Sequence, residues 1–306
     1  MNPPLDPAET KPRFTPAQIT LALLILAFGV CSILYKFLFS HDLGHTSATF
    51  IGIPALLAVL LALAPKPRSA TGVILRGITI ALLIVAPLLG EGYVCILMAT
   101  PLFLIVGLII GLIVDYSRKK RGVTVSCMVL VLLPLSLEGI IPALTYDRHQ
   151  TVEATQTVNA PLSSVASALA QSPNVAATLP RFLRLGFPRP LAAFGSGFAL
   201  NDTRTIHFAG AEGDPPGDLV MRITDLRPGY VRFATISDNT KLTQWLRWQS
   251  SEVLYAPLDA THTTVTWRIS FDRQLDPYWY FTPWERYSVR EAAKYLIAAN
   301  ATPSAR

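Results

Sequence analysis

Five long apolar blocks fill the first half of the chain, with short polar connectors between them. They cover residues 19–39, 48–64, 72–89, 94–114 and 123–144. A helix needs about 20 apolar residues to cross a hydrocarbon core roughly 30 Å thick, so the first, fourth and fifth blocks are long enough and the other two fall slightly short. The pattern predicts a membrane domain of five transmembrane helices over residues 1–146.

Lys and Arg gather in alternate connectors of this half. Lys11 and Arg13 precede the first block, Lys66 and Arg68 follow the second, and residues 118–121 are all basic. The other two connectors contain no Lys or Arg. Because basic loops stay on the cytoplasmic side, we expect an integral protein of the plasma or inner membrane. Its N-terminus would be cytoplasmic and its C-terminal domain extracytoplasmic.

The hydrophobic period changes near residue 151 to that of an α+β domain. The alternating stretch 151–158 predicts a strand, and a short helix is expected over 162–171 with a second helical stretch after Pro173. Residues 180–197 are rich in Pro and Gly and predict a long loop. The pattern then predicts five strands and a closing helix: 203–209, 219–226, 230–237, 246–255, 263–271 and 284–299.

Three stretches of this half resemble the SRPBCC, or START-like, helix-grip superfamily, which includes polyketide cyclase/dehydrase-like and lipid-transfer proteins. They read TVEATQTVNAPLSSVASAL, RTIHFAG and TTVTWRISFDRQLDPYWYFTPWERY. The resemblance covers residues 150–300 and none of the membrane half. It implies an antiparallel sheet wrapped round a long C-terminal helix, with a hydrophobic cavity between them. It implies no particular reaction, because the superfamily mixes binders, transporters and enzymes.

Aromatic residues are dense between Asp276 and Tyr287, where six of twelve residues carry rings. Such rings suit the mouth of a ligand cavity, but they also suit a staple that fastens the closing helix to the sheet. The strand 263–271 places an apolar row on one face, which either lines a cavity or fills the core. The candidate ligand-binding residues are Trp248, Glu252, Trp267, Ile269, Phe271, Tyr278, Trp279, Tyr280 and Trp284.

Few polar residues offer chemistry. Simple alternation puts Glu252 on the same face as Trp248 and Leu254, where a buried carboxylate would need an arginine partner. His207 is the one histidine at the centre of a predicted strand, and Glu138 is the one carboxylate well inside an apolar block, where an ionisable group is costly. No metal spacing, nucleotide loop or nucleophile elbow is present, so no catalytic residue, cofactor or metal is expected.

Charge and cysteine content exclude little else. Residues 1–146 hold 10 Lys and Arg against 6 Asp and Glu, so much of the net charge of +6 lies in the connectors and no nucleic-acid partner is expected. All three cysteines lie in apolar blocks. The oligomeric state stays open.

Three functions follow from this sequence. The first is a membrane-anchored binder of a lipid or another hydrophobic small molecule at the extracytoplasmic face. The second is a cyclase/dehydrase-type enzyme that uses Glu252, His207 or a tyrosine as acid or base. The third is a structural or sensory membrane protein without an open cavity.

Overall fold

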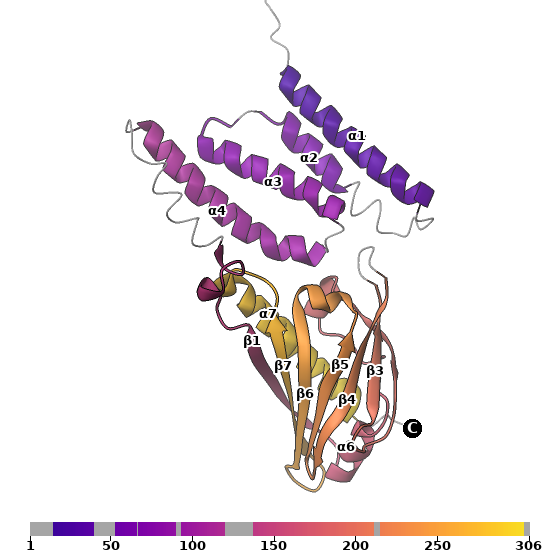
Figure 1. Ribbon diagram of the computed structural model, residues 1–306. Coiled ribbons are helices and arrows are strands. Elements are labelled where there is room, and N and C mark those ends of the chain that lie inside the picture. Colours follow the sequence, from indigo (N-terminus) through magenta and orange to yellow (C-terminus); the bar gives the residue numbers. More distant parts are fainter. Residues whose placement is uncertain are drawn as a thin grey trace, which may run out of the picture. The chain divides into compact units, whose positions relative to one another are not determined.

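The computed structural model describes residues 15–39, 53–65, 67–89, 93–119, 137–210 and 215–302. The chain divides into two compact units, Met1–Thr124 and Val125–Arg306. Figure 1 labels the helices and strands of both.

The first unit is helical. Its described helices are α1 (Pro16–Phe39), α2 (Ile53–Leu63), α3 (Ala70–Leu89) and α4 (Tyr93–Lys119). Neighbours in sequence pack together, α1 on α2, α2 on α3 and α3 on α4. These helices coincide with four of the apolar blocks.

Polar side chains join the helix ends of this unit. The Asp115 carboxylate of α4 accepts hydrogen bonds from the backbone N–H groups of Ala70 and Thr71, at 2.7 and 3.0 Å. Arg76 of α3 donates to the carbonyl oxygens of Ala62 and Ala64, both at 2.8 Å. Helix ends carry unpaired N–H and C=O groups, so these contacts satisfy the start of α3 and the end of α2.

Among the described helices, one is long and apolar enough to cross a membrane: the 23-residue stretch Ile96–Arg118, of mean hydropathy 2.7. The apolar stretches Pro16–Cys31 and Ala70–Ile84 are shorter. By length and composition the structure thus supplies one candidate span, and the five predicted transmembrane helices stay a prediction.

The fifth apolar block ends differently from its prediction. Residues 123–136 lie outside the described residues. The following residues form a turn and the 3-10 helix η2 (Pro142–Leu144) instead of a continued α-helix. Gly139 adopts a φ of +81°, which favours glycine, and Pro142 cannot donate the helical hydrogen bond. Glu138 therefore lies in a turn of the second unit.

The second unit is a seven-stranded antiparallel sheet with a long closing helix. The order of strands across the sheet is β1-β7-β6-β5-β4-β3-β2. Strands β2 to β7 therefore form a meander, and its last strand, β7, pairs with β1. Figure 1 shows the sheet curled, with α7 running along one face. Its elements are β1 (His149–Val158), α6 (Leu162–Leu169), η3 (Phe182–Leu185), β2 (Pro190–Phe194), β3 (Thr203–Phe208), β4 (Gly217–Arg227), β5 (Tyr230–Asp238), η4 (Lys241–Gln244), β6 (Leu246–Pro257), β7 (Thr263–Arg273) and α7 (Tyr278–Ala301).

The six predicted strands all form, and three expectations are wrong. Residues 174–179 form turns and not a second helix. The loop predicted over 180–197 contains η3 and the edge strand β2, which tolerates its initial Pro190 because no strand pairs with its outer side. Helix α7 begins at Tyr278, six residues before the predicted start, so the aromatic segment is largely helical.

Candidate ligand-binding site

The inner face of β7 is the floor of the candidate site. Val265, Trp267, Ile269 and Phe271 alternate along this strand and are all buried, with Phe271 and Ile269 completely so. They belong to one apolar cluster with residues of α6 and α7. Helix α7 packs on β1 and β7, so this row lies beneath it. Trp267 has a polar feature, because its indole Nε1 is buried and makes no hydrogen bond to any described residue.

A β-bulge in β6 decides which residues of that strand face inward. Trp248 lies opposite Phe271, and the pairing resumes with Ser250 opposite Ser270, so Gln249 is an extra residue in the register between β6 and β7. The extra residue shifts the alternation, so Trp248 stays on the buried face and donates from Nε1 to the buried Ser251 hydroxyl at 3.0 Å.

Glu252 consequently lies on the outer face of the sheet, which corrects the prediction that it shares a face with Trp248. Its carboxylate is 3.4 Å from Nη1 of Arg268 and 3.8 Å from Nε of Arg232. Arg268 also pairs with Glu153 at 3.0 Å. These pairs sit among exposed Thr and Ser side chains that bond between β1 and β7. Glu252 is therefore removed from the apolar face and from any ligand beneath α7.

The predicted acid–base pair of the enzyme alternative does not converge. His207 lies on β3, which β4 and β5 separate from β6, and its Nδ1 is 2.7 Å from the half-exposed Asp218 carboxylate. Its neighbours Ile206 and Arg204 face the interior instead. His207 and Glu252 thus occupy separate ion pairs outside the core.

The aromatic residues at the start of α7 play two parts. Trp284 stacks on Phe182 of η3, and Tyr287 meets the edge of the same ring at 4.9 Å between centroids. These contacts fasten η3 to the helix, as the staple interpretation expects. Trp279 is half exposed and meets only the edge of Tyr280 among the ring contacts of the described residues, so it is free to border a ligand.

Two polar residues beneath α7 were not among the predicted site residues. Thr282 and Glu285 lie one turn apart on its buried face, and each is 3% exposed. Glu285 Oε1 accepts from the backbone N–H of Leu275 at 3.4 Å. Burial raises the pKa of Glu285 to about 7, and nearby Asp276 adds to the rise while Arg273 opposes it. The early start of α7 was the missing signal, because it alone puts both residues on one helical face.

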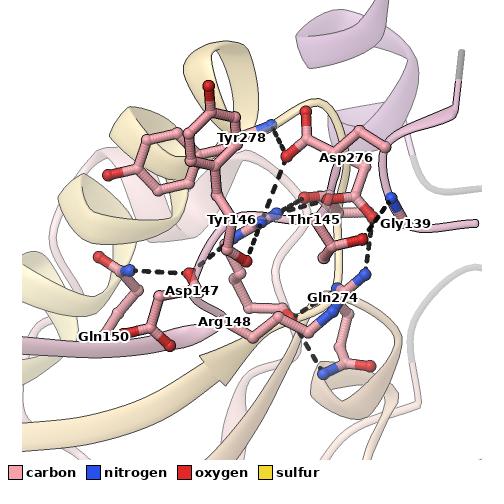
Figure 2. Close-up of polar contacts among 12 residues, drawn as sticks. Gly139, Thr145, Tyr146, Asp147, Arg148, Gln150, Gln274, Asp276 and Tyr278 are labelled. Carbon is pink, nitrogen blue, oxygen red and sulfur yellow. Dashed lines mark hydrogen bonds and ion pairs between the residues drawn. The ribbon is translucent and has the colours of Figure 1, made fainter. Parts of the chain in front are cut away.

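A buried arginine closes the corner between β7 and α7. Arg273, fully buried, pairs with Glu138 at 3.3 Å and with Asp276. It also donates to the carbonyl oxygens of Tyr146 and Asp147. Figure 2 shows this corner, in which Arg148 pairs with Asp276 and the Tyr146 ring lies beside that of Tyr278. We call residues 137–148 the clasp, because they tie the start of the unit to the β7–α7 corner.

Comparison with known proteins gives structural similarity alone. No protein-family model and no curated protein matches the chain. Among solved structures, the ZhuI aromatase/cyclase of Streptomyces sp. R1128 is 16% identical, with a TM-score of 0.30 over 50% of this chain and 86% of that one. A START superfamily protein of Mycobacterium smegmatis is 12% identical, with a TM-score of 0.32 over 48% and 93%. Norcoclaurine synthase of Thalictrum flavum is 10% identical, with a TM-score of 0.33 over 50% and 93%.

The topology itself defines the class of fold. A first strand, a helical excursion, a six-stranded meander that returns to that strand and a long C-terminal helix along one face are the helix-grip arrangement. The second unit therefore has the START-like fold, as the resemblance implied.

Proposed function

We propose that the chain is a membrane-anchored START-like protein that binds a lipid or another hydrophobic small molecule at the extracytoplasmic face. The observation that carries the binding part is the apolar row of β7 beneath α7, in which the buried indole N–H of Trp267 has no partner among the described residues. A polar atom buried in an apolar setting without a partner is unusual, and a bound molecule would supply one. Ligand sites are typically apolar surfaces with a few such polar groups.

Membrane anchoring rests on the first unit. Besides the candidate span Ile96–Arg118, its helices expose large apolar side chains, including Leu23, Leu24, Leu56 and Leu60, each more than half exposed. An apolar surface of this kind suits contact with lipid. The alternation of basic connectors supports a cytoplasmic N-terminus, and five crossings of the membrane would put the second unit on the opposite side.

Lipid mass spectrometry on the full chain, purified in mild detergent, tests the binding proposal. We expect a stoichiometric apolar molecule that survives exchange into a second detergent. Displacement of a neutral fluorescent probe such as phenylnaphthylamine gives the affinity. Trp279→Ala should weaken probe binding about tenfold, a loss of about 1.4 kcal/mol, with little change in melting temperature. Glu252→Gln is the matched control, since its side chain faces outward, and it should leave the affinity unchanged.

The opposite results are equally definite. A chain that copurifies with no apolar molecule and takes up no probe contradicts binding and favours the structural function. For topology, alkaline phosphatase fused after Arg306 should be active and the same enzyme fused after Arg121 inactive. The reverse pattern contradicts the extracytoplasmic placement.

A further inference from the structure

Two oxygen atoms on the buried face of α7 lack the partners that such atoms normally have. Thr282 Oγ1 and Glu285 Oε2 are fully buried, and neither is bonded within the described part of the chain. Leaving a buried polar group unpaired costs about 1–3 kcal/mol, so two within one helical turn require an explanation.

The same helix satisfies its other buried polar side chains locally. Ser288 Oγ donates to the carbonyl of Trp284, and Asn300 Nδ2 donates to that of Leu296, both at 2.8 Å. Thr282 makes no such bond, although a hydroxyl in a helix ordinarily can. Its oxygen is therefore available to a group from outside the helix, and so is Glu285 Oε2 one turn further on.

The surrounding charges select the kind of group. Arg273 and Asp276 act on Glu285 with opposite sign, and Arg273 is already paired with two carboxylates. An anionic group would be repelled by the carboxylates of Glu285 and Asp276, and a cationic group would be repelled by the fully buried guanidinium of Arg273. A buried charge without a partner is strongly unfavourable, so a neutral group fits best.

We propose that Thr282 and Glu285 bind the hydroxyl group of a neutral, otherwise apolar ligand. A hydroxyl can donate one hydrogen bond and accept another, which matches a carboxylate oxygen and a threonine O–H placed one turn apart. The apolar remainder would lie along the β7 row. The inference rests on the proposed binding function and specifies the chemistry of its ligand.

The test compares two isomers on the full chain in mild detergent. Decanol and methyl nonyl ether have the same atoms, but only decanol carries a hydroxyl, and each displaces bound phenylnaphthylamine. We expect decanol to bind about tenfold tighter than the ether, equivalent to about 1.4 kcal/mol. Thr282→Val keeps the shape and removes the hydroxyl, so it should abolish this preference and leave the ether affinity and the folded state intact. Thr282→Ser should keep the preference.

Ser288→Ala is the matched control, because the Ser288 hydroxyl is already bonded within the helix. It should retain the wild-type preference for decanol. If the probe binds but wild type does not distinguish the isomers, or Thr282→Val keeps the preference, the pair holds a buried water only and the inference is overturned while the binding function stands. If no probe binds to wild type, both are overturned.

Discussion

At the scale of single residues, the second unit contains an unusual group, the buried carboxyl group of Glu285. Glu285 is 3% exposed, and its burial lifts the pKa from 4.5 to about 7. The ionised form is therefore disfavoured in the folded state relative to the unfolded chain. This carboxyl group stabilises the fold best when protonated, and its contribution falls as the pH rises.

The pH dependence of stability tests this assignment. Because the folded-state pKa lies above the unfolded value, the unfolded chain loses its proton first, and stability falls between about pH 4.5 and pH 7. Glu285→Gln should remove this loss, so that from about pH 4.5 to pH 8 the variant gains roughly 3 kcal/mol relative to wild type. Thermal melting of the full chain across this range measures it. Thr282→Val, a neutral neighbour, should keep the wild-type slope, and a Glu285→Gln slope parallel to wild type would refute the shift.

The orientation of Glu252 shows a limit of predicting side-chain orientation from the alternation of residues along a strand. Alternation correctly places Trp267, Ile269 and Phe271 on one buried face, because β7 is regular. It misplaces Glu252, because one extra residue in β6 changes the face of every residue beyond it. Nothing in the stretch Trp248–Ser251 marks a bulge, since neither Gly nor Pro is present there.

At the scale of elements, the junction of β7 and α7 depends on a residue far away in sequence. Glu138 precedes Arg273 by 135 positions, and both side chains are almost completely buried. The Glu138 carboxylate also accepts from the Tyr278 N–H at 3.1 Å, at the first residue of α7. An anion at a helix N-terminus is favourable, so one carboxylate stabilises both the arginine and the helix start.

Replacing Glu138 and replacing Arg273 should lower the free energy of unfolding by different amounts. Glu138→Gln leaves Arg273 paired with Asp276 and should lower the free energy of unfolding by about 1–3 kcal/mol. Arg273→Met leaves the buried Glu138 carboxylate without its cation, while Asp276 keeps its pair with Arg148, and should cost about 3–5 kcal/mol. Glu153→Gln, in an exposed pair, should cost less than about 1 kcal/mol. Urea denaturation measures the free energy of unfolding of the three variants. An Arg273→Met variant as stable as Glu153→Gln would contradict the proposed importance of the buried ion pair.

The elements themselves could largely be predicted from the sequence. Period-two alternation identified β1 and β3 to β7, and only β2 was hidden, because Pro188, Pro190 and Gly195 indicate a loop. The early start of α7 at Tyr278 was missed, because the predicted helix begins only after Pro283, at Trp284. Pro283 is the sixth residue of α7, beyond the first turn in which proline is well tolerated, so helix propensity favours a later start than the observed one.

At the scale of the whole molecule, the clasp changes where the second unit begins. The sequence placed the boundary between the two domains between residues 146 and 150. Residues 137–147 instead supply Glu138, two carbonyl acceptors for Arg273 and the Tyr146 ring that stacks on Tyr278. They provide three of the five hydrogen-bond partners of the Arg273 side chain among the described residues.

Two fragments test this boundary. A fragment of residues 137–306 should unfold cooperatively, whereas one of residues 149–306 should melt about 4–8 °C lower, as expected for a loss of roughly 2 kcal/mol in a domain of this size. Circular dichroism of both, recorded in the same buffer, provides the comparison. Adding Arg273→Met to each fragment is the control. It removes the side chain that the clasp contacts, so it should reduce the difference in melting temperature between the two fragments. Equal melting temperatures would show that the clasp contributes nothing.

The clasp also limits how this domain can be transplanted. Its first essential side chain, Glu138, lies within the last apolar block, so the junction that composition marks near residue 147 cuts through the folded unit. A chimaera that joins residue 149 to a foreign segment would leave the buried guanidinium of Arg273 without the Glu138 carboxylate, with Asp276 as its remaining acidic partner among the described residues. Exchange of anchors, in the laboratory or between genes, therefore has to carry residues 137–148 along with the sheet.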